Sequence, residues 1–489
     1  MRPWIWTVAV AGWGAAVVYA LIHHEVQHAA ALALCAIGFW IVLGIVLARI
    51  YGIRRHVTAH FGRRVKNPQM IRHTVTHSER VDVARFLEEL HKEQDAPNTL
   101  FGIGSGYQTD LTFIILNNQE PSAIEWDSVR VSTTDWRQCP SNALYLLRNG
   151  STPFAALIAA NEDQRRGGRF LLQILALSHE EAQSALNRIL DGARESSIYR
   201  GRTLSLKKSD DPGESFAIRF HELSEIPRDR VILPESVMEV VERNVLSPLK
   251  HRETLQRSGR SSRRGILFHG PPGTGKTLLT KHISGEYKDF TVILLTGWQL
   301  RLIRESFNLA RFLSPSLIVL EDVDLIARSR KRNRHNTVLH ELLDELDGLA
   351  PESECVVLMT TNRPEILEGA LASRPGRVDQ AIYFPLPDAD CRRRLFELFG
   401  EQLDFSALDL ARWVSRTEGA SPAFLEELVR KSVIFAAERG EESSPIRLTD
   451  DDFENAMREL VLAGGDLTRK LLGFHVEEDE PPGGSTPSR

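Results

Sequence analysis

Two stretches near the start of the chain are apolar and contain no charged residue. Residues 3–22 and residues 29–48 are 20 residues each, and an α-helix of that length spans about 30 Å, the thickness of the hydrocarbon core of a bilayer. The residues between them, 23–28, suffice only for a tight connection. The hydrophobic pattern therefore predicts a transmembrane helical hairpin over residues 1–50.

Basic residues flank this hairpin and are absent from its connection. Arg2 precedes the first run, Arg49 follows the second, and a basic juxtamembrane linker occupies residues 51–75. Because positive charge stays on the cytoplasmic side, we expect both ends of the hairpin in the cytoplasm. Because the chain shows no polar N-terminal transit peptide, we expect a multi-pass protein of a bacterial plasma (inner) membrane. A cleaved signal peptide that ends at Ala20 is the alternative.

Residues 76–205 mix helical and strand patterns and predict a small α+β N-domain. The apolar spacing indicates one helix and four strands, at residues 81–94, 111–116, 143–147, 154–158 and 170–177. The pair Asn149-Gly150 predicts a hairpin turn. Ser178 followed by Glu181 predicts a capping box at the start of a further helix. We find no catalytic constellation here, so the role of this domain stays open.

The second half of the chain alternates short buried strands with helices, which is typical of a parallel α/β sheet. Strand patterns lie at residues 265–269, 317–320, 355–359 and 380–384, and helical patterns at residues 232–249, 388–400, 406–416, 421–437 and 449–463. They predict an α/β core over residues 220–387, with helices over residues 388–470. The tail at residues 477–489 is acidic and rich in Pro, Gly and Ser, and is predicted to be disordered.

Composition changes this picture little. The chain has 489 residues, enough for two or three folded units, and its net charge of −5 gives no general attraction to nucleic acid or anionic lipid. The four cysteines lie far apart and form no CxxC pair. Their spacing argues against both a disulfide framework and a zinc site.

A glycine-rich loop joins the strand at residues 265–269 to a helical pattern. Its sequence, GPPGTGKT, fits GxxxxGK[ST] in the strand–loop–helix context that a phosphate-binding loop requires. Backbone N–H groups of such a loop turn inward onto phosphates, Lys276 can bridge the β- and γ-phosphates, and the Thr277 hydroxyl can ligate Mg²⁺. The sequence therefore predicts a site for ATP and Mg²⁺ built from Gly270, Pro271, Pro272, Gly273, Thr274, Gly275, Lys276, Thr277 and Leu278.

Polar side chains follow the next buried strands along the chain. Glu321 and Asp322 come directly after one strand, where carboxylates can hold the Mg²⁺ shell and polarise an attacking water. Asn362 follows the next strand, where an amide can orient that water. Two arginines then stand on a short turn and suit a finger that reaches the γ-phosphate of a neighbouring subunit, with a structural ion pair as the alternative. The predicted catalytic residues are Lys276, Glu321, Asp322, Asn362, Arg374 and Arg377, and the predicted metal ligands are Thr277, Glu321 and Asp322.

Taken in order, GPPGTGKT, LIVLEDVD, TTN and SRPGRVD resemble the AAA family of ATPases over residues 225–465, about half of the chain. The resemblance implies a P-loop α/β domain with a parallel sheet and a C-terminal helical lid, which hydrolyses ATP with Mg²⁺ in a homo-oligomeric ring. It also implies that Gly419 and Ala420 begin the lid helix near the adenine, and that Val231 and Ile232 lie on the adenine side.

Two features differ from the usual pattern of the family. The acidic pair is Glu321-Asp322 instead of Asp-Glu, so which acid activates water is open. Residues 297–315 are shorter than in members that thread polypeptides, and Trp298 is the only aromatic candidate for a pore loop there. Both features are shared by mitochondrial inner-membrane AAA chaperones of respiratory complex III assembly, which the ATPase domain resembles. They disfavour a plain threading unfoldase.

Two further patterns have simpler explanations. His24, Glu25 and His28 form HExxH, a zinc-protease pattern, but no third ligand is evident and polar residues at headgroup level explain it better. Residues 328–334 are basic without interleaved aromatic residues, which fits a solvated loop or a subunit contact better than nucleic acid.

The leading hypothesis is a membrane-anchored ATPase ring that remodels or assembles a protein substrate of unknown identity, with nucleic acid disfavoured as a partner. The second is a slow nucleotide-dependent switch or scaffold that recruits partners through residues 76–205. The third is a metalloprotease that uses residues 24–28.

Overall fold

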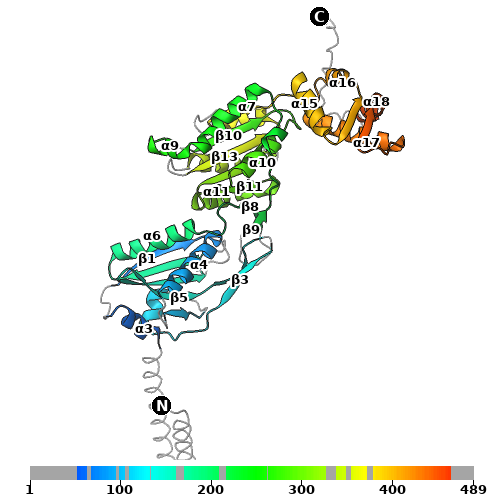
Figure 1. Cartoon of the computed structure of the whole chain (residues 1–489). Helices are drawn as coiled ribbons and strands as arrows, with labels where there is room; N and C mark the ends of the chain where they lie inside the picture. The colour runs from blue at the N-terminus through cyan, green and yellow to red at the C-terminus, as the bar shows by residue number, and fades with distance from the viewer. Residues whose placement is uncertain are drawn as a thin grey trace, which may run out of the picture. The chain divides into compact units, whose positions relative to one another are not determined.

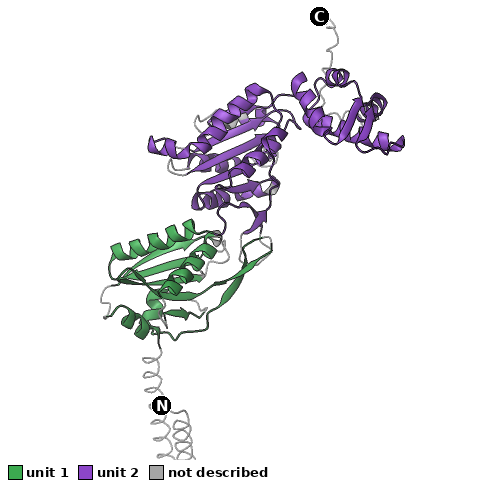
Figure 2. Cartoon of the chain, viewed as in Figure 1, with its two compact units in different colours: residues 1–197, 209–215 green, residues 198–208, 216–489 purple. Residues whose placement is uncertain are grey.

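The computed structural model describes residues 52–62, 68–94, 99–104, 110–132, 134–160, 170–208, 216–260, 263–325, 337–348, 354–371 and 378–463. The predicted membrane hairpin at residues 1–50 and the predicted tail at residues 477–489 lie outside these ranges. Among the described helices, none combines the length and the apolar character that crossing a bilayer requires. The chain divides into two compact units, which are residues 1–197 with 209–215 and residues 198–208 with 216–489 (Figure 2).

The first unit is built on a five-stranded antiparallel sheet (Figure 1). Its strands, in spatial order, are β1 (Gln69–Val75), β7 (Phe170–Ala176), β6 (Thr152–Ala160), β5 (Ala143–Asn149) and β2 (Leu100–Gly102). A separate hairpin pairs β3 (Trp126–Arg130) with β4 (Trp136–Pro140).

Helices cover both faces of this sheet. Leu144 and Leu146 of β5 pack with α3 (Ile53–His60) and α5 (Leu111–Leu116). Tyr145 lies between them in sequence, and its ring contacts His91 of α4 (His77–Glu93). Because successive side chains of a strand point to opposite faces, α4 lies across the sheet from α3 and α5. Helix α6 (His179–Glu195) packs beside α4.

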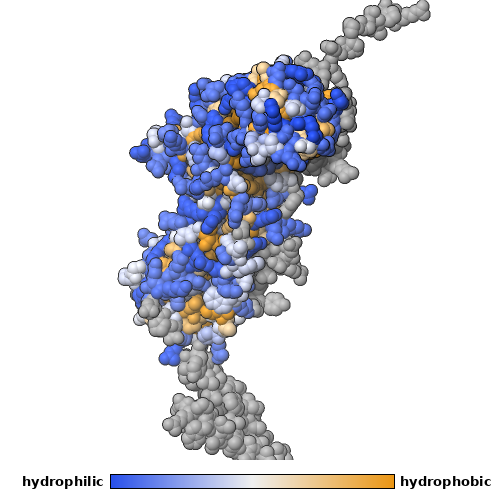
Figure 3. Space-filling model, turned by 45° about the vertical axis from the view of Figure 1, so that its right-hand side comes forward, coloured by the Kyte–Doolittle hydropathy of each residue, from blue (hydrophilic) through white to orange (hydrophobic). Residues whose placement is uncertain are grey.

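The strand predicted at residues 111–116 is wrong, because this segment forms helix α5. The Asp110 carboxylate accepts hydrogen bonds from the backbone N–H groups of Thr112 and Phe113, which caps the helix. Leu111 and Ile114, three residues apart, are then the buried positions. Phe113 and Leu116 are exposed. The face of the molecule that Figure 3 shows is mostly hydrophilic, with smaller apolar patches.

Two local predictions for the first unit are confirmed. In the β5–β6 hairpin Asn149 pairs with Thr152, and Gly150 adopts a positive φ of 60° in the turn. The Ser178 side chain accepts from the Glu181 N–H, and the Glu181 carboxylate accepts from the Ser178 N–H. This capping box begins α6.

The second unit contains a seven-stranded sheet with a largely parallel core. Its strands, in spatial order, are β14 (Gln380–Tyr383), β10 (Arg264–His269), β13 (Cys355–Thr361), β12 (Ser316–Leu320), β11 (Thr291–Leu295), β8 (Thr203–Lys208) and β9 (Phe216–His221). The larger helices of this core are α7 (Glu235–Val241), α10 (Lys276–Glu286), α11 (Ile303–Phe312), α13 (Thr337–Asp347) and α14 (Pro364–Leu371). The short elements are η2 (Arg228–Arg230), the π-turn η3 (Glu242–Leu246), α8 (Ser247–Lys250), α9 (Arg252–Arg257) and η4 (Gly297–Leu302).

The boundary between the units differs from the predicted N-domain end at residue 205. Residues 198–208 belong to the second unit because β8 pairs in parallel with β11, where Leu204 lies beside Ile293. Strand β9 then pairs antiparallel with β8 and ends the sheet. The segment predicted to end one domain therefore extends the sheet of the next.

A helical region completes the second unit and lies where the sequence predicts a lid. It comprises α15 (Ala389–Phe399), α16 (Leu410–Arg416), α17 (Pro422–Glu438) and α18 (Asp450–Arg458), followed by the π-turn η6 (Glu459–Ala463). Two short parallel strands, β15 (Leu403–Ala407) and β16 (Ile446–Thr449), join them. Trp413 is fully buried at the centre, and its indole Nε1–H donates to the Asp450 carboxylate over 2.6 Å.

The capping box at α6 provides a stability test of the first unit. We expect Ser178→Ala to lower the free energy of unfolding of this unit by about 1 kcal/mol, because the first-turn N–H of Glu181 loses its acceptor. Urea unfolding, together with amide hydrogen exchange of α6, measures the change. Ser178→Asp restores an acceptor and should recover most of the loss; equal destabilisation by both variants would contradict the assigned role.

Candidate nucleotide site

The register of three neighbouring strands gathers the predicted site residues. His269 at the end of β10 lies beside Thr361 of β13, and Leu320 at the end of β12 lies beside Met359. Because these strands are parallel, the segments that follow them leave the same edge of the sheet. The glycine-rich loop, the acidic pair and Asn362 are therefore neighbours.

Backbone geometry explains two of the glycines in the loop. Gly270 has a φ of 146°, and a Cβ there would lie 2.3 Å from the carbonyl oxygen of Phe384. Gly275 has a φ of 94° and precedes the first turn of α10, which begins at Lys276. Side chains at either position would strain the backbone or clash. The loop can therefore turn its N–H groups toward one point at the N-terminus of α10.

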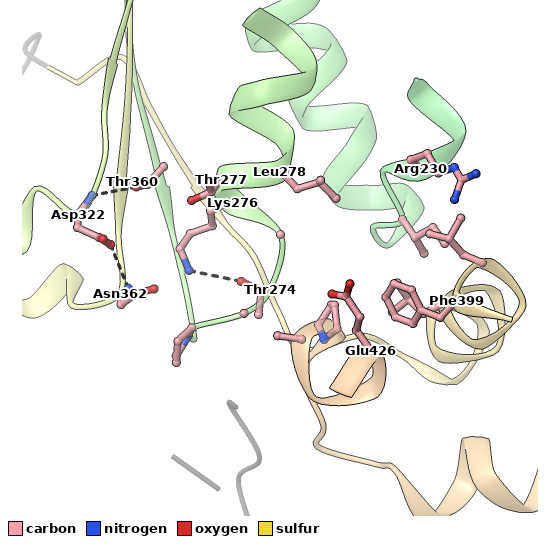
Figure 4. A pocket seen from close by; sticks show the side chains of 18 residues that line it. Arg230, Thr274, Lys276, Thr277, Leu278, Asp322, Thr360, Asn362, Phe399 and Glu426 are labelled. Atoms are coloured by element: carbon pink, nitrogen blue, oxygen red, sulfur yellow. Dashed lines mark hydrogen bonds between the residues drawn. The ribbon is translucent and has the colours of Figure 1, made fainter. Parts of the chain in front are cut away.

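Lys276 is buried in this loop, with 6% of its surface exposed. Its ammonium Nζ donates to the carbonyl oxygens of Gly270 over 2.9 Å and Pro271 over 2.7 Å, and to the Thr274 hydroxyl over 3.4 Å (Figure 4). Burial lowers the pKa of Lys276 to about 8, against the opposing charges of Asp322 and Asp324. The site thus holds a desolvated cation that phosphate oxygens would stabilise.

The two acids of the predicted pair occupy different surroundings. The Asn362 amide Nδ2 donates to the Asp322 carboxylate over 3.2 Å, and the Asp322 N–H donates to the Thr360 hydroxyl over 3.1 Å (Figure 4). Burial raises the pKa of Glu321, while the charge of Lys281 and a hydrogen bond from the Thr277 side chain act in the opposite direction. Asp322 therefore adjoins Asn362, and Glu321 adjoins Thr277.

A cavity of about 590 Å³ opens beside these residues. Its lining comprises Arg230, Ile232, Pro272, Gly273, Thr274, Gly275, Lys276, Thr277, Leu278, Asp322, Thr360, Asn362, Leu395, Leu398, Phe399, Pro422, Ala423 and Glu426. One end is polar, from the glycine-rich loop to Asn362, and the other is formed by apolar side chains of α15 and α17. This volume and mixed lining suit a nucleotide, with phosphates at the polar end and the base at the apolar end.

Sequence reasoning predicts a helical lid near the adenine but does not identify the side chains of α15 and α17 that line this cavity. No motif marks Leu395, Leu398 and Phe399 of α15, and their helical spacing indicates only a buried face. The Ala423 N–H donates to the Gly273 carbonyl over 3.3 Å, which ties α17 to the loop. Arg230 pairs with Glu401 over 2.6 Å at the base end.

The remaining predicted residues are placed as follows. Ile232 lines the cavity, whereas Val231 belongs to the core beneath the sheet. Gly419, with a φ of 76°, and the buried Ala420 precede α17, and neither lines the cavity. Arg374, Arg377 and the HExxH residues His24, Glu25 and His28 lie outside the described residues. Within the described ranges, no group of three or more His, Cys, Asp or Glu side chains could hold a metal ion.

The residues present fit both ATP and Mg²⁺. Hard cations such as Mg²⁺ take oxygen ligands and few protein groups, so the Thr277 hydroxyl with the neighbouring Glu321 carboxylate suits the ion. Lys276 and the loop N–H groups suit the phosphates, and the apolar end of the cavity suits adenine.

The lowered pKa of Lys276 predicts proton uptake on nucleotide binding. Near pH 9 the free lysine is mostly neutral, since its pKa is about 8, whereas phosphate oxygens would raise that pKa and hold the lysine charged. We expect ADP binding to take up roughly one proton near pH 9 and almost none near pH 7. Calorimetry in two buffers of different ionisation enthalpy measures this.

A matched control is Lys288→Ala, which removes an exposed lysine that pairs with Glu225. It should leave the proton uptake unchanged. Equal uptake at both pH values, or none near pH 9, would overturn the assignment.

Comparisons with known proteins agree with this geometry. Residues 266–386 match the model of the ATPase family associated with various cellular activities (AAA). The chain is 33% identical over 244 residues to the proteasome-activating nucleotidase of Thermococcus onnurineus, covering 47% of this chain and 60% of that protein. It is 32% identical over 244 residues to the 26S proteasome regulatory subunit 8 homolog B of Arabidopsis thaliana, covering 46% and 56%.

The matched region thus spans 60% or less of the length of these two relatives. It includes the glycine-rich loop, the acidic pair and Asn362, which line up at one edge of the sheet. The chain therefore carries an AAA ATPase domain, a module that binds ATP with Mg²⁺ and hydrolyses it.

Proposed function

We propose that this protein is a membrane-anchored AAA ATPase that forms a ring and uses ATP hydrolysis to remodel or assemble protein substrates at the membrane. The observation that carries the enzymatic part is the convergence of Lys276, Asp322 and Asn362 on one cavity. The hydrogen bond between Asn362 and Asp322 holds an amide and a carboxylate together at the polar end.

The geometry supports a division of labour between the two acids. Glu321 adjoins the Thr277 hydroxyl and would help to hold Mg²⁺, which supplies charge neutralisation at the phosphates. Asp322 lines the cavity and would polarise a water, while Asn362 fixes the orientation of its carboxylate. Lys276 would exchange its loop carbonyls for phosphate oxygens.

What the protein does with the energy of ATP hydrolysis is inferred from sequence features. Arg374 and Arg377 suit a finger in trans, which requires an oligomer in which neighbouring subunits share each site. The segment from residue 297 to residue 315 is taken up by η4 and α11 and a short link to β12, which leaves little chain for a pore loop. This favours remodelling or assembly over polypeptide threading, in line with the resemblance to chaperones of respiratory complex III assembly.

Membrane attachment is part of the proposal and rests on residues 3–22 and 29–48, which contain no charged residue. The basic flanks at Arg2 and Arg49 support an ATPase domain on the cytoplasmic side of the membrane, and the proposal extends to a bacterial plasma membrane.

A slow nucleotide-dependent switch is the second candidate, and the short Asp322 carboxylate favours it. Asp has one methylene fewer than the Glu usual at this position, so its reach toward a water is smaller. Tight ADP retention with very slow turnover would support the switch over the remodelling ATPase.

Mixing two inactive variants tests the shared site. We expect Lys276→Ala to lose ATP binding and Arg377→Ala to lose turnover while it still binds ATP. If each site combines Lys276 of one subunit with Arg377 of the next, an equal mixture should regain turnover at about a quarter of the interfaces. Phosphate release measures this. No recovery on mixing, or full turnover by Arg377→Ala alone, would rule out the ring mechanism.

Alkaline extraction tests the anchor. We expect the full chain to stay in the membrane pellet at high pH, because apolar spans resist extraction, and a chain that lacks residues 1–50 to move to the supernatant. Immunoblotting of both fractions measures the distribution. Release of the full chain would contradict the hairpin and leave the ATPase assignment intact.

A further inference from the structure

Glu426 is a charged side chain in a part of the cavity that the phosphate chemistry does not use. It lies on α17, three residues after Ala423, whose N–H donates to the Gly273 carbonyl of the loop. Residues three apart share one face of a helix, so the face of α17 that touches the loop also presents Glu426. Both residues line the cavity.

The position of the carboxylate falls between the two ends of the cavity. In Figure 4 it points into the space between Thr274 of the phosphate-binding loop and Phe399 of α15. A nucleotide with its phosphates on the loop and its base against Phe399 would place its ribose there.

The other charged groups nearby are already paired. Arg230 is held by Glu401 over 2.6 Å, and Arg430 is held by both carboxylate oxygens of Glu427 over 2.7 Å. Within the described part of the chain, no hydrogen bond or ion pair engages Glu426. An exposed carboxylate at a helix surface is usually just solvated, but this one lines the cavity at ribose level.

We propose that Glu426 recognises the ribose, with its carboxylate accepting hydrogen bonds from the 2′- and 3′-hydroxyl groups. A carboxylate is a strong acceptor for two adjacent hydroxyls, and the same pairing fixes the ribose in dinucleotide sites. Glu426 is thereby a specificity-determining residue that separates ribonucleotides from deoxyribonucleotides. The inference rests on the proposed nucleotide site and adds to it the choice of sugar.

The test compares ADP with 2′-deoxy-ADP by calorimetry on the full chain, so that turnover does not intervene. We expect the wild-type protein to bind ADP about tenfold more tightly than 2′-deoxy-ADP, the usual value of one hydrogen bond to a charged group. Glu426→Ala should weaken ADP binding more than 2′-deoxy-ADP binding, because ADP loses the bonds of both hydroxyls and 2′-deoxy-ADP loses only that of its 3′-hydroxyl, so that the preference disappears. Glu426→Gln, which keeps an acceptor without the charge, should retain an intermediate preference.

The matched control is Glu427→Ala, because Glu427 is the next residue on α17, pairs with Arg430 and does not line the cavity. It should keep the wild-type preference. A wild-type protein without preference, or a preference that survives in Glu426→Ala, would overturn the inference. Loss of both ligands in Glu426→Ala with an unchanged ratio in Glu426→Gln would overturn it as well. Failure of the wild-type protein to bind ADP at all would instead refute the nucleotide site.

Discussion

The nucleotide site depends on one constraint, the parallel register of β10, β12 and β13. The register sets His269 beside Thr361 and Leu320 beside Met359, so the three strands end within a residue or two of each other. Only then can the Asp322 N–H reach the Thr360 hydroxyl and the Asn362 amide reach the Asp322 carboxylate. All five side chains of β12 are buried, so a slip by one residue would require both faces of the strand to repack.

The site also requires a buried lysine ammonium whose hydrogen bonds are satisfied by the loop itself. Carbonyl groups of Gly270 and Pro271 hold the Lys276 ammonium, and they are available because Gly270 turns against the Phe384 carbonyl where no side chain fits. Burial has already lowered the pKa of Lys276, which means that the buried ammonium is destabilised. Anionic phosphate oxygens would stabilise the ammonium better than neutral carbonyl groups do. Nucleotide binding would therefore change the hydrogen bonds of this one side chain.

Sequence reasoning succeeded where the chemistry demands particular residues in order along the chain, and failed where contacts come from distant segments. The loop, Asp322 and Asn362 were predictable because each follows a buried strand. The apolar run at residues 111–116 was mistaken for a strand, because periodicity in six residues cannot separate strand from helix and the Asp110 cap decided it. Residues 198–205 are predicted as part of the N-domain but belong to the second unit, since the pairing of β8 with β11 leaves no local signal. Arg230 and Glu426 carry no motif, and only the folded cavity brings them together.

The backbone conformation at residue 322 explains why the acidic pair is Glu-Asp and not Asp-Glu. Asp322 has a φ of 52°, a left-handed conformation that few residues other than glycine adopt and that Asp tolerates better than Glu. Its N–H is held by Thr360, so the turn is fixed from both the main chain and, through Asn362, the side chain. A strained residue that two neighbours stabilise is characteristic of a functional position. The shorter acid therefore follows from the shape of this turn, while the longer Glu321 interacts with Thr277 and Lys281.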